Sequence, residues 1–276
     1  MKPSSAIAAF ALCLVSAGLL NASQAQEALG PARHWPQSGE PGSPFPATIA
    51  ATPMAEGYLA PGALDSAALL GPPPSIGSPR ERADRATFRA TRRLAGTARW
   101  RLATEDNDLG GGAFRRFSCA AGVTVLPTTT PATARIMLRI DADTRNLGLP
   151  VKLRYSRLRP LIGNRLPICV PRAAWMWQNP SYPSAHATEG WAWALVLAEL
   201  RPDQADALLQ NGREFGESRI ICGVHFESDV EAGRLLGAAM VARLHTNPAF
   251  LADMAQAREE LATAARTGPA PYDCAR

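Results

Sequence analysis

Long hydrophobic runs are scarce in this sequence of 276 residues. After residue 20 no stretch is long and apolar enough to span a bilayer, which argues against a protein built from membrane-spanning helices. The five cysteines include no C-x-x-C pair, and this argues against a structural zinc site. No long basic run or basic-aromatic strip is present, so nothing indicates binding to nucleic acid. Lysine is nearly absent, and arginine greatly outnumbers it.

The rest of the composition is typical of a globular protein. Hydrophobic residues make up 46% of the chain, which is enough for one sizeable core, and the length allows one or two domains. The net charge is +5, and it would be +4 without residues 1–25, whose one charged side chain is Lys2. This balance favours anionic partners, but it does not choose among phosphate esters, nucleic acid and lipid headgroups.

Residues 1–25 have the pattern of a secretory signal peptide. Lys2 supplies the positive start, residues 7–20 form a short apolar run, and the S-Q-A sequence ending at Ala25 is a small-x-small cleavage site. We therefore expect a mature chain that begins near Gln26 and is soluble in the periplasm or secreted. An uncleaved membrane anchor is the alternative.

Removal of the signal peptide would also remove Cys13 and leave four cysteines. These are Cys119, Cys169, Cys222 and Cys274. An even number in an oxidising compartment predicts two disulfides, for which three pairings are open. A metal site is the rival interpretation, and the wide separation of the cysteines argues against it. We interpret Cys222 as half of a disulfide rather than as a reactive thiol.

Composition divides the exported chain into an arm and a domain. Residues 26–80 are rich in Pro, Gly, Ser and Ala and predict an extended arm, laid on the surface and partly disordered. Residues 81–276 show helical periodicity and few strand signals, so we predict a nearly all-helical domain. The predicted helices cover residues 80–108, 111–123, 130–149, 184–200, 202–220, 228–245 and 247–266.

Capping residues indicate where two of these helices begin. Ser184 is a good N-cap for the helix that ends near residue 200. Ser228 and Glu231 have the spacing of a capping box, which predicts a helix start at Ser228. This start leaves His225 in the turn before the helix and Asp229 in its first turn, close enough for the carboxylate to bind and orient the imidazole.

Several residues that can bind or transfer a phosphoryl group surround this turn in the sequence. Arg219 precedes His225 by six positions, and His186 follows Ser184 at a predicted helix N-terminus, where free N–H groups favour anions. Lys152 and Arg159 add two cations upstream. Singly, each has an ordinary structural explanation. Together, three cations, a helix N-terminus and two histidines are what gripping and attacking a phosphate ester requires.

The spacing of these residues matches a known signature. The sequence reads K-x6-R-P from Lys152, then P-S-A-H ending at His186, then S-R-x5-H-x3-D ending at Asp229. It resembles the superfamily of type 2 phosphatidic acid phosphatases, bacterial class A nonspecific acid phosphatases and vanadium haloperoxidases. The flanking segments "GPPPS", "TEDND", "RRFSCAAGV" and "LHTNPAF" are similar to the class A acid phosphatases in particular. The resemblance covers roughly residues 70 to 265.

The resemblance implies an all-α fold, a single helical bundle, and a role for each signature residue. His225 would be the nucleophile that forms a phosphohistidine, Asp229 would orient it, and His186 would be the general acid. The implied phosphate-binding residues are Lys152, Arg159, Ser184, Ala185 and Arg219. No metal and no cofactor are implied. Because two histidines of ordinary pKa about 6.5 would share the acid and base roles, we expect a mildly acidic optimum.

The implied function is a broad hydrolysis of phosphate monoesters, with nucleotides, sugar phosphates and aryl phosphates all open as substrates. A vanadate-dependent haloperoxidase and a non-catalytic phosphate-binding protein are the alternatives. The chain departs from the signature at Ala185, which is usually glycine, and at Ala187 and Glu189. These changes bear on substrate range, and Glu189 would repel anions if it faced the pocket. A homodimer or higher homo-oligomer is left open.

For four aromatic residues and three acidic ones, the sequence supports a functional role less strongly. Trp175, Trp177 and Tyr182 precede the P-S-A-H segment and fit a pocket mouth that stacks on an aromatic leaving group, but ordinary packing fits them equally well. Tyr155 fits a core position as well as a pocket wall. The acidic residues are interpreted as a structural cluster rather than a metal site; they are Glu105, Asp106 and Asp108.

Overall fold

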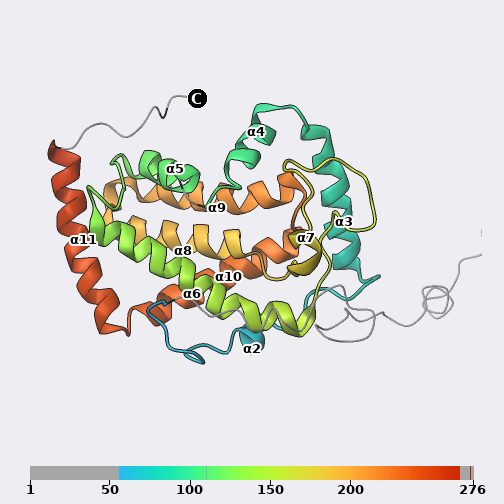
Figure 1. Cartoon of the computed structure of the whole chain (residues 1–276), viewed down its shortest axis with the longest axis horizontal. Helices are drawn as coiled ribbons and strands as arrows, with labels where there is room; N and C mark the ends of the chain where they lie inside the picture. Colours follow the sequence, from blue (N-terminus) through green and yellow to red (C-terminus); the bar gives the residue numbers. More distant parts are fainter. Residues whose placement is uncertain (1–55, 110, 268–273, 275–276) are drawn as a thin grey trace, which may run out of the picture. The chain divides into compact units, whose positions relative to one another are not determined.

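The computed structural model describes residues 56–109, 111–267 and 274, and every regular element in them is a helix (Figure 1). The predicted all-α fold is therefore confirmed. The predicted signal peptide and residues 26–55 of the predicted arm lie outside the described residues. Within the described ranges, no helix combines the length and the apolarity that crossing a membrane requires.

The helices follow one another in the order expected from the sequence, with some changes in their ends. The α-helices are α2 Ser66–Leu70, α3 Pro79–Thr91, α4 Ala98–Glu105, α5 Gly111–Ala121, α6 Pro131–Tyr155, α7 Trp175–Gln178, α8 Ala185–Leu200, α9 Ala205–Cys222, α10 Glu227–Leu244 and α11 Pro248–Thr267. Two short 3₁₀ helices, Arg92–Leu94 and Pro202–Gln204, precede α4 and α9. The predicted helix over 80–108 is thus divided into α3 and α4.

Helix α8 is the centre of the bundle. Its sequence, AHATEGWAWALVLAEL, is apolar on nearly every side, which suits a helix surrounded by others. It packs against α9, α10 and α6, and α11 crosses the far ends of α6 and α8 (Figure 1). Trp193 fills the interior between these helices, where its ring meets Phe117 edge-on and its indole N–H donates to the carbonyl of Met137. The α8 N-terminus is thereby held at one end of the bundle.

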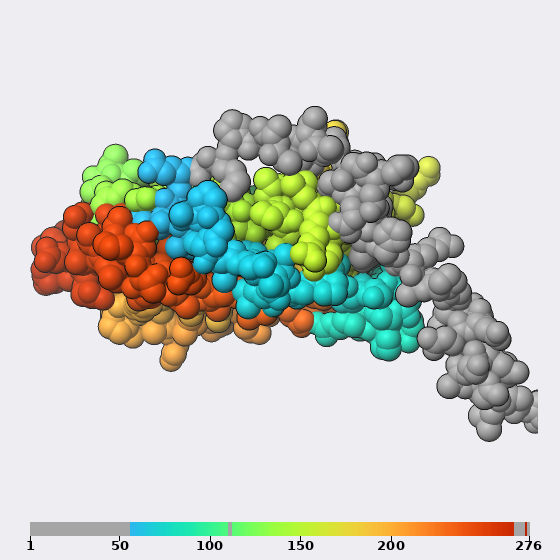
Figure 2. Space-filling model, turned by 90° about the horizontal axis from the view of Figure 1, so that it is seen from below, coloured from blue at the N-terminus to red at the C-terminus, as the bar shows by residue number. Residues whose placement is uncertain are grey.

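The described half of the predicted arm is tied to the helices. Tyr58 is buried, its main-chain N–H donates to Asp143 on α6, and its hydroxyl donates to Asp253 on α11. Figure 2 shows this segment, in blue, lying across the surface made by α6 and the C-terminal helices. The segment includes α2, and α3 begins at Pro79 with Ser78 as its N-cap. The arm boundary at residue 80 remains a prediction.

Helix α8 begins as predicted, whereas α10 does not. Ser184 is the N-cap of α8, and its hydroxyl accepts a hydrogen bond from the N–H of Ala187. Helix α10 starts at Glu227 rather than Ser228, and the carboxylate that accepts from its N-cap, Phe226, belongs to Asp229. The predicted capping box is wrong because the Ser228 hydroxyl bonds instead to the buried Asp84 on α3.

Both predicted disulfides form, and the structure decides their pairing. Cys119 is bonded to Cys274, and Cys169 is bonded to Cys222. The second bridge attaches the loop between α6 and α7 to the C-terminal end of α9. The chain leaves α9 at Gly223, whose φ of 82° suits glycine and whose missing side chain makes room for the guanidinium of Arg92.

Candidate functional site

The eight predicted site residues come from four places in the chain and meet at one end of the bundle. Lys152 is in the last turn of α6, and Arg159 is in the loop that follows. Ser184, Ala185 and His186 form the N-terminus of α8. Arg219 is in the last turn of α9, while His225 and Asp229 flank the start of α10. Close packing of α10 at Gly233 against the Ser184 carbonyl holds two of these helix starts together.

The ring of His225 has a defined orientation. Its Nε2 atom lies 3.0 Å from Nη1 of Arg159, and because a guanidinium only donates, this nitrogen carries the lone pair. Its Nδ1 atom, which then bears the hydrogen, lies 3.3 Å from the Ser181 hydroxyl and 3.6 Å from Oδ2 of Asp229. The lone pair of His225 therefore faces Arg159, and the other ring nitrogen faces a carboxylate.

Asp229 is held as an anion. Its Oδ2 atom accepts from the Ser181 hydroxyl at 2.5 Å and from the N–H of Phe226 at 2.8 Å. Its Oδ1 atom accepts from Arg157 at 2.6 Å. Burial by itself would raise the pKa of Asp229, but the charge of Arg157, the nearby ring of His225 and the hydrogen bond from Ser181 hold that pKa well below its usual range. A fixed negative charge therefore lies behind His225.

Arg157 and Ser181 are functional candidates that sequence reasoning missed. Arg157 is wholly buried, bonds to both Asp84 and Asp229, and lies over the ring of Phe226. It lies only two positions before Arg159, but a single arginine is usually a surface residue, so no local pattern distinguishes Arg157. Its partner Asp84 lies 73 residues away in sequence, and no local pattern predicts that contact.

Lys152 and Arg219 are buried cations that both lie close enough to Arg159 for its charge to act on them. Lys152 donates to the Pro180 carbonyl at 2.6 Å, and burial together with the charge of Arg159 lowers its pKa well below the usual value. Burial lowers the pKa of Arg159 to about 10. Burial and the charge of Arg159 lower the pKa of Arg219 to about 9. Because the charge of Arg159 disfavours the charged forms of Lys152 and Arg219, an anion that bound beside them would be strongly stabilised.

Arg219 has spare hydrogen-bond donors. The side chain is 1% exposed, and among the described residues its Nε and Nη1 atoms have no hydrogen-bond partner. Unpaired buried donors are costly, so an arrangement that retains them is suited to a ligand with acceptor oxygens. The neighbouring α8 N-terminus adds main-chain N–H groups at Ala185 and His186, which no preceding turn of the helix can satisfy.

His186 lies at the open side of the site, where it and Ala185 are partly exposed. Its ring stacks on Phe215, and its Nε2 atom lies 3.3 Å from the main-chain carbonyl oxygen of Asn107. Burial of the ring atoms and the charge of Arg219 lower the pKa of His186 well below its usual value. This shift favours the neutral form of His186, and a bound anion would favour its protonated form.

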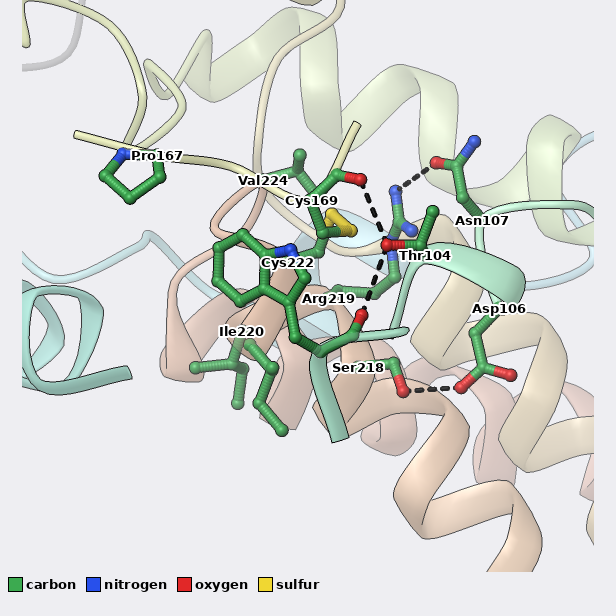
Figure 3. Close-up of a disulfide and its surroundings, with 12 residues drawn as sticks. Thr104, Asp106, Asn107, Pro167, Cys169, Ser218, Arg219, Ile220, Cys222 and Val224 are labelled. Atoms are coloured by element: carbon green, nitrogen blue, oxygen red, sulfur yellow. Dashed lines mark hydrogen bonds between the residues drawn. A yellow bond between two sulfur atoms is a disulfide. The ribbon is translucent and has the colours of Figure 1, made fainter. Parts of the chain in front are cut away.

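A disulfide and hydrogen bonds lie on both sides of Arg219, and we call this set of contacts the frame (Figure 3). The Cys169–Cys222 disulfide lies on one side of it, and Thr104 donates to the Cys169 carbonyl at 3.0 Å. On the other side, the hydroxyl of Ser218 donates to Asp106, which also forms an ion pair of 2.8 Å with Arg116. Asp106 is thus structural, as predicted for the acidic cluster.

The remaining residues that the sequence singled out separate into two groups. Trp175 is 44% exposed and its ring lies 5.2 Å from the guanidinium of Arg159, whereas Tyr182 is buried against Tyr155. A stacking role at the mouth therefore remains a prediction for Trp175.

Glu189 is buried, and its charged neighbours are Asp141 and Arg145 on α6. It lies on the α6 side of α8.

Comparison with known proteins identifies one matching family and a similar solved structure. The PAP2 superfamily matches residues 140–251, which include all eight predicted site residues. A solved transmembrane PAP2 type phosphatidylglycerolphosphate phosphatase from Bacillus subtilis has a TM-score of 0.46 and 20% identity, over 60% of this chain and 85% of that one.

Curated bacterial proteins are more similar in sequence. An acid phosphatase of Zymomonas mobilis is 40% identical over 74% of this chain and 78% of its own length. A non-specific acid phosphatase of Providencia stuartii is 38% identical over 72% of this chain and 82% of its own, and one of Salmonella typhimurium is 38% identical over 70% and 78%.

Proposed function

Because this chain belongs to the PAP2 superfamily and to its bacterial acid phosphatases, and is a phosphatase, we propose a mechanism for it. It hydrolyses phosphate monoesters through a phosphohistidine at His225, with broad specificity and without a metal ion. One observation carries the proposal. Buried Arg159 lies at the lone pair of a histidine whose other nitrogen faces a buried carboxylate, and two further buried cations, Lys152 and Arg219, are close enough to Arg159 to be affected by its charge.

In the first step, Nε2 of His225 attacks phosphorus, the P–N bond forms, and the bond from phosphorus to the ester oxygen breaks. His186 donates its proton to that departing oxygen. The Nδ1–H of His225 then carries positive charge, which the carboxylate of Asp229 stabilises at 3.6 Å and through the Ser181 hydroxyl. In the second step, water attacks phosphorus, His186 takes the proton from water, and the P–N bond breaks to release phosphate.

The cations bind the nonbridging oxygens, where charge resides throughout phosphoryl transfer. Lys152, Arg159 and Arg219 can together match the nearly two negative charges of a monoester near neutral pH. The Ser184 hydroxyl already caps α8, and its hydrogen is available for an anion, as are the N–H groups of the α8 N-terminus. The dianion also supplies the negative charge that allows His186 to be protonated when substrate is bound.

We propose that the enzyme acts in the periplasm or outside the cell. Its two disulfides are typical of proteins that fold in an oxidising compartment. The predicted signal peptide at residues 1–25 would deliver the chain there. Nucleotides, sugar phosphates and aryl phosphates all present the same phosphate group to the site, so Lys152, Arg159 and Arg219 do not restrict the leaving group.

Hydrolysis of para-nitrophenyl phosphate tests this function. The assay compares the wild-type chain with His225→Ala and with His245→Ala, a control on the partly exposed histidine that pairs with Glu199. We expect EDTA-resistant turnover that is strongest on the acid side, lost only in His225→Ala, and accompanied by an acid-labile phosphohistidine in ³¹P NMR. Absence of turnover with vanadate still bound would refute the phosphatase mechanism and favour a haloperoxidase or a binding protein.

A further inference from the structure

The connection between α4 and α5 reaches into the site at Asn107, which lies outside the three-part signature of the site but within the flanking segment TEDND. The side-chain oxygen of Asn107 accepts a hydrogen bond from Nη2 of Arg219 at 3.1 Å (Figure 3). Its main-chain oxygen lies 3.3 Å from Nε2 of His186. Asn107 therefore contacts both Arg219 on α9 and His186 on α8.

The position of Asn107 is fixed from both sides. Its main-chain N–H donates to the Thr104 carbonyl at 3.2 Å, and the Thr104 hydroxyl donates to Cys169 of the disulfide. The adjacent Asp106 is buried and bonded to both Arg116 and Ser218. Because these partners are themselves buried or cross-linked, Asn107 is attached to the same frame as Arg219.

A neutral amide is well suited to holding Arg219. It satisfies one donor of the guanidinium without cancelling its charge, so the full positive charge remains for the phosphate. The other donors, Nε and Nη1, have no partner within the described ranges and remain for ligand oxygens. A carboxylate in the same place would form an ion pair with Arg219 and would compete directly with a phosphate dianion.

The main-chain contact determines the proton position on His186. A carbonyl oxygen only accepts, so Nε2 of His186 bears the hydrogen and Nδ1 is the nitrogen that exchanges a proton with the ester oxygen and with water. The same residue that holds the phosphate-binding Arg219 thus also fixes which nitrogen of His186 performs acid–base chemistry.

We propose that Asn107 is a positioning residue that couples phosphate binding by Arg219 to proton transfer by His186. This inference rests on the proposed function, because it assigns Asn107 a role in the same reaction. It also specifies two properties that can be measured without turnover. These are the affinity of the site for inorganic phosphate and the tautomer of His186.

The test compares Asn107→Asp and Asn107→Ala with a matched control, Asn211→Asp. Asn211 makes the same kind of contact, since its side-chain oxygen accepts from Nε of Arg116 at 2.6 Å, but it touches no proposed site residue. Calorimetry measures phosphate binding, ¹⁵N NMR reports the His186 tautomer, and the pH profile of kcat/KM reports its pKa.

We expect Asn107→Asp to weaken phosphate binding by about ten-fold or more, since a loss of 1.4 kcal/mol corresponds to ten-fold. It should also move the basic limb of kcat/KM to higher pH, because the new carboxylate offsets the charge of Arg219 that lowers the pKa of His186. Asn107→Ala should weaken binding without that shift. Asn211→Asp should alter the melting temperature but neither phosphate binding nor the pH profile.

Three results would overturn the proposal. They are unchanged phosphate affinity in Asn107→Asp, equal effects in Asn107→Asp and Asn211→Asp, and a wild-type His186 with its hydrogen on Nδ1. Failure of the proposed function gives a different pattern. In that case the wild-type chain has no turnover, while weaker phosphate binding in Asn107→Asp still supports the contact between Asn107 and Arg219.

Discussion

Replacement of Arg157 by methionine should damage both stability and catalysis. Arg157 is the buried cation between two carboxylates, at 2.7 Å from Asp84 and 2.6 Å from Asp229. Methionine keeps most of the volume and removes the charge, so both carboxylates would be left without their principal cation in the protein interior. The consequence should be a general loss of stability and a specific loss of the charge that orients His225.

The expected loss follows from the burial of all three groups. Breaking a buried ion pair by removing one partner costs about 3–5 kcal/mol, because the remaining charge stays buried. Arg157, Asp84 and Asp229 are each at most 1% exposed, so the upper half of that range applies to Arg157→Met. The control is Arg145→Met on α6, whose side chain is 54% exposed and whose i,i+4 pair with Asp141 is worth only about 0.3–0.5 kcal/mol.

The effect of Arg157→Met should depend on pH in a definite direction. In the wild-type chain the pKa of Asp229 is depressed, so its stabilising contribution is present above the unfolded pKa of about 3.9 and is lost only as pH falls through the folded pKa. Without Arg157, burial dominates and raises the pKa of Asp229. The destabilisation should therefore be greatest near pH 7 and should narrow toward pH 4, where Asp229 becomes protonated.

Urea unfolding at pH 4, 5.5 and 7 measures this effect for wild type, Arg157→Met and Arg145→Met. Arg157→Lys keeps the charge but cannot reach both carboxylates with the same geometry, so it should retain part of the stability and of the activity if Arg157→Met does not fold. Equal losses in Arg157→Met and Arg145→Met would refute the reasoning. A loss independent of pH would refute the assigned role of Asp229.

Two further predictions concern the frame and the core. Replacing Cys169 and Cys222 by alanine should lower the free energy of unfolding by about 4 kcal/mol, because the bridge closes a loop across a sequence separation of 53 residues. Thermal unfolding measures this loss. The double variant should also have a higher KM than a variant that is equally destabilised far from the site, and an unchanged KM in kinetic assays would contradict the bracing role. Burial, with a smaller effect from Asp141, raises the pKa of Glu189 well above its usual value, so its carboxylate destabilises the fold increasingly as pH rises past the unfolded pKa of about 4.3. Glu189→Gln should therefore raise the melting temperature at pH 7 more than at pH 4, and an equal change at both values would count against this assignment.

Local chemistry explains which features the sequence could predict. The N-cap at Ser184 depends on its own hydroxyl and on the N–H of Ala187, three residues away. The order and type of the helices follow from apolar periodicity in the same way. The three cations, two histidines and Asp229 were found because their spacings match a signature, and the structure places them at one end of the bundle.

Contacts between distant segments explain what could not be predicted. The α10 start differs from the prediction because the Ser228 hydroxyl bonds to Asp84, which is 144 residues away in sequence. The disulfide pairing, left open among three arrangements, depends on which cysteines the packed helices bring together. Glu189 could not be assigned to the pocket or to the core until α6 and α8 were placed against each other.

The helical class and the order of the helices could be predicted from the sequence because they depend on neighbours within a few positions, and the candidate site residues could be named because their spacings match a signature. What surrounds those residues became known only from the folded structure. Arg157 behind Asp229, Asn107 beside Arg219, and the bridge from Cys169 to Cys222 join segments that are 53 to 112 residues apart in sequence. Such contacts arise from the packing of the core, which determines how deeply the site residues are buried and which charged groups lie beside them.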